Sequence, residues 1–261
     1  MITEVTCRSA LSPCSLGGLA YSLSPYRGCA FGCAFCYSPS LLHEAREWGT
    51  FLEAKVNVPD VLRVEIKRKK KGSVWLSAVT DPYQPAESKY ELTKRCLQVL
   101  KGAGWPVVIQ TRAPLIVRDK ELIAGFERAD VGFSISTLDE RYRKVFEPHA
   151  PPSHERLGAM RELSDRGVRT WLFLGPIIPG VTANDVDAII DAAKGSGARA
   201  VQFDRLRLRS GVWERLAGVV PVELKAEFEF ARRRGSGYFS PIEERIRRRC
   251  TRAGLRIEPA F

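Results

Sequence analysis

The stretch Cys29-Ala-Phe-Gly-Cys33-Ala-Phe-Cys36 places three cysteines within eight residues, at spacings of four and three. Three thiolates from one loop can converge on one soft-ligand centre, because zinc and iron–sulfur clusters both select sulfur. A structural zinc site uses four protein ligands, and the nearest further candidate, His43, lies seven residues past the last cysteine. The spacing therefore favours an iron–sulfur cluster with one open iron. The alternatives are a zinc site completed by Cys7, Cys14 or His43, and buried free cysteines that pack as small apolar side chains.

Beyond these cysteines, strand-like and helix-like segments alternate along the chain. Five short segments rich in β-branched or aromatic residues predict buried strands, namely Val74–Val79, Val107–Thr111, Val131–Ser136, Arg169–Leu174 and Ala198–Phe203. Four segments predict helices, namely Glu87–Leu100, Asp119–Phe126, Ser153–Arg166 and Ala183–Lys194. This alternation is typical of parallel strands joined by helical crossovers, in a barrel or in a doubly wound sheet. Both folds bind ligands at the carboxyl ends of the strands.

Composition and charge narrow the class of protein. The 261 residues are 44% hydrophobic and 27% charged, as in a globular protein with a sizeable core. No apolar run approaches the roughly 20 residues that cross a bilayer and no secretory signal is visible, so we expect a cytoplasmic protein without membrane contact. The net charge of +11 favours a polyanionic partner, RNA or DNA, although an enzyme that is merely basic is the alternative. Arg205, Arg207 and Arg209 could line a phosphate-binding strip, or belong to a solvated edge strand whose charges prevent pairing. The better candidate for nucleic-acid contact is the Arg-rich tail near Tyr238-Phe239, with Arg232–Arg234 and Arg247–Arg249.

The cysteine pattern, with Phe35 before the last cysteine and Tyr37 after it, resembles the signature of the radical S-adenosylmethionine (SAM) superfamily. The wider run Ser24-Pro25-Tyr26-Arg27-Gly28-Cys29 resembles the branch of that superfamily that includes spore photoproduct lyase and its uncharacterised archaeal and bacterial relatives. Further matches to this branch are Thr80-Asp81-Pro82-Tyr83-Gln84-Pro85-Ala86-Glu87, Arg118-Asp119, Glu147-Pro148 and Gly175-Pro176-Ile177-Ile178-Pro179-Gly180.

The resemblance implies an α/β fold, a partial (β/α)6 barrel of the TIM type, with a [4Fe–4S] cluster held by Cys29, Cys33 and Cys36 in the loop after the first strand. In that family the open iron binds SAM, and an electron from a donor such as a ferredoxin or flavodoxin cleaves SAM to a 5′-deoxyadenosyl radical. We expect an N-terminal extension over residues 1–23, the radical SAM core over 24–204, and an Arg-rich C-terminal region over 205–261 packed on the barrel.

The predicted strand ends supply candidates for holding SAM. The carboxylate of Asp81 can pair with the ammonium of SAM, and the guanidinium of Arg112 with its carboxylate. Two serines alternate along one strand and so share a face that could meet the ribose. The full set is Tyr37, Thr80, Asp81, Thr111, Arg112, Ser134 and Ser136. The alternatives are a turn opened by Asp81, a solvated Arg112 and serines that only pack.

One position departs from the resembling branch. Spore photoproduct lyase carries a hydrogen-donating cysteine directly before the acidic residue that follows this strand, where the present chain has Val79-Thr80. We therefore do not expect a spore photoproduct lyase that uses that cysteine. The four remaining cysteines could in number hold a second cluster. They are Cys7, Cys14, Cys96 and Cys250, and they are scattered along the chain, whereas the ligands of a cluster usually stand close together in the sequence.

The sequence predicts a radical SAM enzyme that modifies or repairs a nucleic acid, with no catalytic residue assigned. One alternative keeps the radical chemistry and takes a protein side chain or a small metabolite as substrate. The other is a zinc-stabilised binding module without turnover.

Overall fold

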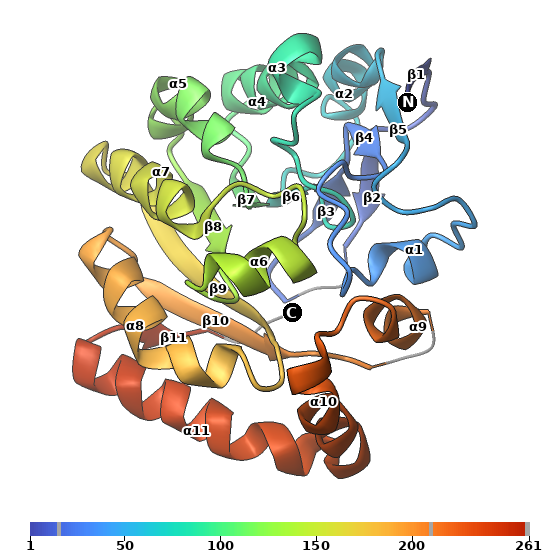
Figure 1. The fold of residues 1–261 in the computed structure, drawn as a ribbon. Coiled ribbons are helices and arrows are strands. Elements are labelled where there is room, and N and C mark those ends of the chain that lie inside the picture. The colour runs from blue at the N-terminus through green and yellow to red at the C-terminus, as the bar shows by residue number, and fades with distance from the viewer. Residues whose placement is uncertain (15–16, 209–210, 259–261) are drawn as a thin grey trace.

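A sheet of eight strands forms the centre of the computed structural model, which describes residues 1–14, 17–208 and 211–258 (Figure 1). The strand order is β11-β10-β9-β8-β7-β6-β3-β2. Every neighbouring pair from β3 to β11 is parallel, and β2 runs antiparallel to β3. The strands are β2 (Leu11–Pro13), β3 (Tyr21–Leu23), β6 (Val74–Leu76), β7 (Val107–Thr111), β8 (Ala129–Ser134), β9 (Arg169–Ile177), β10 (Ala200–Arg205) and β11 (Arg256–Ile257). The six parallel strands from β3 to β10 confirm the predicted partial (β/α)6 fold.

The strands are apolar along their length because helices cover the outer face of the sheet. The side chains of Val74, Leu76, Val107, Ile109 and Val131 are completely buried. On the next strands, the ring of Trp171 lies where a Cβ on Gly132 would stand, only 2.2 Å from the nearest ring atom. A glycine in β8 is therefore needed for the indole to cross the sheet surface.

Helices follow each of the parallel strands from β6 to β10 (Figure 1). They are α3 (Glu87–Tyr90) and α4 (Leu92–Gly102) after β6, the 3-10 helix η1 (Pro114–Asp119) and α5 (Lys120–Ala124) after β7, α6 (Glu140–Phe146) and α7 (Ser153–Asp165) after β8, α8 (Thr182–Gly195) after β9, and α9 (Val212–Ala217), α10 (Val222–Arg234) and α11 (Ser236–Ala253) after β10. The helix predicted over Glu87–Leu100 is broken, because Glu91 adopts a left-handed backbone with φ of 49°. No helix in the described ranges is long and apolar enough to cross a membrane.

A second, small sheet carries the entry to the cysteine loop. Its strands β1 (Ile2–Val5), β5 (Leu52–Lys55) and β4 (Tyr26–Arg27) lie in the order β1-β5-β4. Two helices flank it in the chain, α1 (Ser38–Leu41) directly after the loop and α2 (Val58–Glu65) after β5. Strands β2 and β3 precede residue 24 and β11 follows residue 204, yet all three belong to the central sheet. The domain boundaries expected from the sequence stay a prediction.

The last helix of the described residues packs on the helical layer of the central sheet. Helix α11 lies against α8 and buries Ile246 and Cys250 completely. Arg205 ends β10, whereas Arg209, named above as a candidate for nucleic-acid contact, lies outside the described residues.

Candidate active site

The three cysteines of the loop lie together at the amino-terminal side of α1. Two tight turns shape the loop, since the Gly32 amide donates to the Cys29 carbonyl at 3.3 Å and the Cys36 amide to the Cys33 carbonyl at 3.1 Å. Cys29 and Cys33 are 8% and 7% exposed, and Cys36 is half-buried. One thiol is thus more open to solvent than the other two.

Burial controls the acidity of these thiols. It raises the pKa of Cys29 to about 12, with the nearby charge of Asp81 acting in the same direction. Burial also raises the pKa of Cys33 well above its ordinary value, and the charges of Cys29 and Cys36 add to the effect. Each of the three sulfurs is thus within electrostatic reach of the other two. Without a bound metal, the buried Cys29 and Cys33 thiols hold their protons at neutral pH, so that metal binding must release those protons.

The chemistry of the donor set fits a cluster better than a single ion. Among the described residues, no three His, Cys, Asp or Glu side chains are grouped as ligands of one metal ion. An iron–sulfur cube distributes its thiolates over separate iron atoms, so its ligands need not converge on one point. The three cysteines of this loop would hold such a cube and leave its fourth iron open.

The loop is anchored to the segment that follows β6. The Gln84 side chain, which is completely buried, accepts a hydrogen bond from the Ala30 amide at 2.9 Å and donates to the Gly28 carbonyl at 3.3 Å. The Thr80 hydroxyl donates to the same carbonyl. Gly28 itself has φ of 86° and lies so close to Phe51 that a Cβ would stand 2.5 Å from its carbonyl oxygen. The backbone that enters the cysteine loop therefore has one fixed path.

Asp81 joins the ends of β6 and β7. Its buried carboxylate accepts hydrogen bonds from the Thr111 hydroxyl at 2.7 Å, the Arg112 amide at 2.7 Å and the Tyr83 amide at 2.9 Å. Burial raises the pKa of Asp81, although these hydrogen bonds act to lower it. The structure thus brings Asp81, Thr111 and Arg112 together, as the sequence predicts for strand ends, and gives Asp81 a structural role that the turn alternative anticipates.

Arg112 belongs to a buried ionic chain. Its Nε lies 3.1 Å from Oε1 of Glu147, and Nη2 of Arg156 lies 2.5 Å from Oε2 of the same carboxylate. The guanidinium of Arg112 also lies 5.6 Å from the centre of the Phe35 ring in the cysteine loop. Burial acts to raise the pKa of Glu147, but the charges of Arg156 and Arg112 outweigh it and hold that pKa below its usual value. Arg112 is consequently not the solvated side chain of the alternative interpretation.

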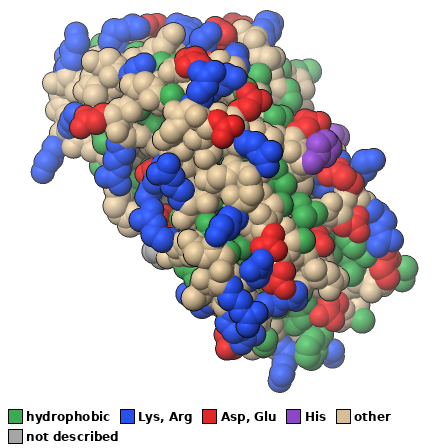
Figure 2. Space-filling view, turned by 90° about the vertical axis from the view of Figure 1, so that its left-hand side faces the viewer, with side chains coloured by type: hydrophobic (Ala, Val, Ile, Leu, Met, Phe, Trp, Pro, Cys, Tyr) green, Lys and Arg blue, Asp and Glu red, His purple; other side chains and the backbone are tan. Residues whose placement is uncertain are grey.

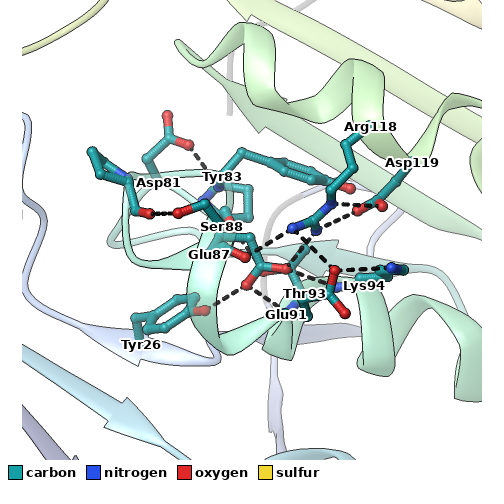
Figure 3. Close-up of polar contacts among 12 residues, drawn as sticks. Tyr26, Asp81, Tyr83, Glu87, Ser88, Glu91, Thr93, Lys94, Arg118 and Asp119 are labelled. Carbon is teal, nitrogen blue, oxygen red and sulfur yellow. Dashed lines mark hydrogen bonds and ion pairs between the residues drawn. The ribbon is translucent and has the colours of Figure 1, made fainter.

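A second ionic network is centred on Glu87 (Figure 3). The completely buried Glu87 carboxylate accepts hydrogen bonds from the Tyr26 hydroxyl, from the Thr93 and Lys94 amides at 3.0 and 3.1 Å, and from Arg118 at 3.0 Å. The two amides belong to the first turn of α4, so Glu87 satisfies their free N–H groups. Figure 3 shows that this one carboxylate joins β4, α4 and η1.

The other predicted SAM contacts lie at neighbouring strand ends. The Tyr37 hydroxyl donates to the Ala78 carbonyl at 2.6 Å, and the Tyr37 side chain is 53% exposed. Ser134 accepts a hydrogen bond from Gln110 at 3.0 Å, and Ser136 donates to the Gly175 carbonyl at 3.0 Å. Both serines are buried. Six of the seven residues thus lie at or after the ends of β6, β7 and β8, and Tyr37 lies at the start of α1. Their role in binding SAM stays a prediction.

Sequence reasoning named some of these side chains only as parts of motifs and missed others. Gln84, Glu87, Arg118 and Glu147 lie in runs that match the branch, but nothing in the sequence shows which group each one contacts. Arg156 gives no signal, since an arginine within a helical pattern normally faces solvent. Cys96 in α4 and Cys250 in α11 are buried in different helices.

The family comparison assigns most of the barrel. The model of the radical SAM superfamily matches residues 23–193. An uncharacterised protein of Methanocaldococcus jannaschii is 28% identical over 195 residues, which cover 74% of this chain and 73% of that protein. An uncharacterised protein of Mycobacterium tuberculosis strain H37Rv is 29% identical over 222 residues, 79% of this chain and 65% of that protein. A radical SAM Nα-GlyT isomerase of Pseudomonas phage M6 is 26% identical over 184 residues, 69% of this chain and 38% of that protein.

Solved structures share the fold at low sequence identity. Spore photoproduct lyase complexed with dinucleoside spore photoproduct superposes with a TM-score of 0.73 at 14% identity, over 99% of this chain and 82% of the lyase. Streptococcus suis SuiB bound to SAM superposes with a TM-score of 0.60 at 15% identity, over 92% of this chain and 50% of SuiB.

Proposed function

This chain belongs to the radical SAM superfamily, whose cofactors are a [4Fe–4S] cluster and SAM, and we propose that its substrate is a nucleic acid, which it modifies or repairs. When bound, these cofactors supply a radical by reductive cleavage of SAM, with an electron from a donor such as a ferredoxin or flavodoxin. Cys29, Cys33 and Cys36 are the proposed ligands of the cluster.

The proposed work of the surrounding residues is to position these groups. The hydrogen bonds from Thr80 and Gln84 to Gly28 fix the entry to the loop. The Arg112 guanidinium, held by Glu147 beside Phe35, is placed to attract a carboxylate such as that of SAM. Asp81 orients the Arg112 backbone through its hydrogen bond to the amide. Held groups of this kind lose little orientational freedom when a ligand binds.

The observation that carries the nucleic-acid proposal is an exposed cluster of arginine and aromatic side chains on α9 and α10. The Arg232 guanidinium lies 4.8 Å from the centre of the Trp213 ring, and that of Arg234 lies 5.6 Å from the Phe230 ring, which is 43% exposed. In the part of the chain that the structure describes, none of Arg232, Arg233 and Arg234 forms an ion pair. Guanidinium and aromatic faces both stack on unpaired bases.

The overall charge distribution agrees with this assignment. Residues 205–261 contain 14 Arg and Lys against 7 Asp and Glu. Figure 2 shows one face of the molecule, on which acidic side chains lie among the Lys and Arg. One comparison adds support, because a solved neighbour, spore photoproduct lyase, is complexed with a dinucleoside spore photoproduct.

Binding of labelled single-stranded DNA and RNA, measured by fluorescence anisotropy over a range of salt concentrations, tests the proposal. Replacing Arg232, Arg233 and Arg234 by Gln together should weaken binding at least tenfold. It should also reduce the slope of log K against log salt by about 0.7 for each lost phosphate contact. Formation of 5′-deoxyadenosine in the presence of each nucleic acid reports turnover.

The matched control is Lys67→Gln/Arg68→Gln/Lys70→Gln, which removes three exposed positive charges just past the end of α2, far from α10 in the ribbon view of Figure 1. This variant should bind as the parent does. Binding that is absent, or that does not change with salt, would contradict a nucleic-acid substrate and favour a protein side chain or a small metabolite.

A further inference from the structure

Helix α9 brings an arginine to the cysteine loop from a distant part of the chain. Nη2 of Arg215 donates a hydrogen bond to the Cys36 carbonyl, although 179 positions separate the two residues. The residue before α9, Gly211, has φ of 80°, and a Cβ there would stand 2.8 Å from the Ser40 hydroxyl of α1. The start of α9 is thus packed against the helix that follows the cysteines, and the contact with Cys36 is not an isolated one.

Arg215 has unused hydrogen-bonding capacity at this contact. Its Nε is buried and has no acceptor among the described residues. A buried N–H group without an acceptor is costly, since it has lost its hydrogen bond to water. The hydrogen bond from Nη2 to the Cys36 carbonyl places this donor beside the residue whose sulfur would ligate the cluster.

Arg215 lies beside Cys36, the most exposed of the three cysteines. Cys36 is half-buried, whereas Cys29 and Cys33 are buried. Reduction adds a negative charge to an iron–sulfur cluster, so its potential depends on nearby charge, on hydrogen bonds to sulfur and on solvent exposure. A guanidinium at the most exposed ligand changes all three.

We propose that Arg215 is a positioning residue that covers Cys36 and raises the reduction potential of the bound cluster. The positive charge stabilises the reduced form more than the oxidised form, and Nε supplies a donor to sulfur when the cluster is present. This role rests on the cluster that the family brings and is independent of the nucleic-acid substrate. Arg215 also lies beyond the region that the family model matches, which ends at residue 193.

Redox titration of the reconstituted protein, followed by electron paramagnetic resonance and without substrate, tests this role. Arg215→Gln should make reduction about tenfold less favourable, a shift of about 59 mV to more negative potential for one electron. Arg215→Lys keeps the charge without the planar fork and should shift less. Arg248→Gln is the matched control, because Arg248 is exposed and pairs with Glu244 at 2.8 Å on α11.

An Arg215→Gln protein with full iron content and an unchanged potential would overturn the proposal, as would an equal shift in Arg248→Gln. If Arg215→Gln retains no cluster, iron release to a chelator decides the matter. Release from Arg215→Lys that is faster than from Arg248→Gln supports the covering role, and release at the parent rate refutes it. A parent chain that takes up no iron would instead contradict the cofactor assignment, and unaltered potentials say nothing against nucleic-acid binding.

Discussion

The cysteine loop is held by contacts of two kinds, at its start and at its end. At its start, here called the inner side, Thr80 and Gln84 form hydrogen bonds with Gly28 and Ala30. Thr80 and Gln84 lie within the region that the family model matches. On the outer side, Arg215 holds Cys36 from a helix beyond that region. The inner contacts are embedded in buried networks and should decide whether the loop forms. The outer contact is partly exposed and should decide the properties of what the loop binds.

The largest effect is expected on the inner side, from Glu87→Gln. The carboxylate oxygens of Glu87 accept from Tyr26, Thr93, Lys94 and Arg118, so an amide nitrogen in place of one oxygen would face donors. The substitution also leaves the charge of Arg118 with less compensation. We expect the free energy of unfolding of the apoprotein to fall by about 3–5 kcal/mol, as when a buried ion pair loses one partner.

Urea denaturation followed by circular dichroism measures this loss. The control is Glu162→Gln, outside this network, where an exposed carboxylate pairs with Lys120 at 2.8 Å. Exposed pairs of this kind contribute less than about 1 kcal/mol. Equal losses in the two variants would show that the buried network does not hold the inner side.

A somewhat smaller effect is expected from Gly28→Ala. The left-handed backbone costs a non-glycine residue about 1–2 kcal/mol, and the new methyl group would also press on the Phe51 carbonyl. We expect a loss of roughly 2–4 kcal/mol in the free energy of unfolding, together with low iron content after reconstitution. Gly158→Ala is the control, because it lies within α7 with open space at its Cβ and should stabilise by about 0.5–1 kcal/mol. A Gly28→Ala protein as stable as its parent would show that the entry to the loop can shift.

The strands were the most predictable part of the fold, because strands buried on both faces leave an apolar run in the sequence. Their ends were less so. The strand predicted to end at Val79 stops at Leu76, since Ser77 takes a left-handed backbone with φ of 63°. The helix predicted over Glu87–Leu100 breaks at Glu91 for the same physical reason. A single non-glycine residue with a left-handed backbone leaves no trace in the periodic pattern of apolar residues.

The site was predictable in part because cluster ligands are close together in the sequence. Cys29, Cys33 and Cys36 stand in one loop, so their spacing carries the chemistry. The partners that hold the loop come from far along the chain, as Arg156 does for Glu147 and Arg215 for Cys36. Such contacts depend on how helices pack, which the local pattern around each arginine does not contain.

Gln84→Leu should have a smaller effect on stability, and it tests whether the contacts that hold the loop also set the potential of the cluster. Gln84→Leu removes the hydrogen bonds to Ala30 and Gly28 and leaves their backbone groups without those partners, at a cost of about 1–3 kcal/mol. Iron and sulfide analysis after anaerobic reconstitution should show reduced occupancy, while the potential of the clusters that do form stays near that of the parent. A shift in potential as large as that expected for Arg215→Gln would erase the distinction between the two sides.

The smallest effect is expected where the C-terminal region is attached to the barrel. Helix α11 docks on α8 mainly through buried apolar side chains such as Ile246, and the ion pair of Arg245 with Asp187 at 2.9 Å lies at the exposed rim. Asp187→Asn should therefore cost at most about 1 kcal/mol at low salt and nothing measurable in 1 M salt.

The hydrogen bond from Arg245 lowers the pKa of Asp187. A lowered pKa in the folded state means that the contribution is present above the unfolded value of about 3.9 and is lost as the pH falls through the folded value. The difference in melting temperature between parent and variant should thus vanish in acid. A large difference that persists in salt would mean that rim charges, rather than apolar packing, hold the region that delivers Arg215 to the cysteine loop.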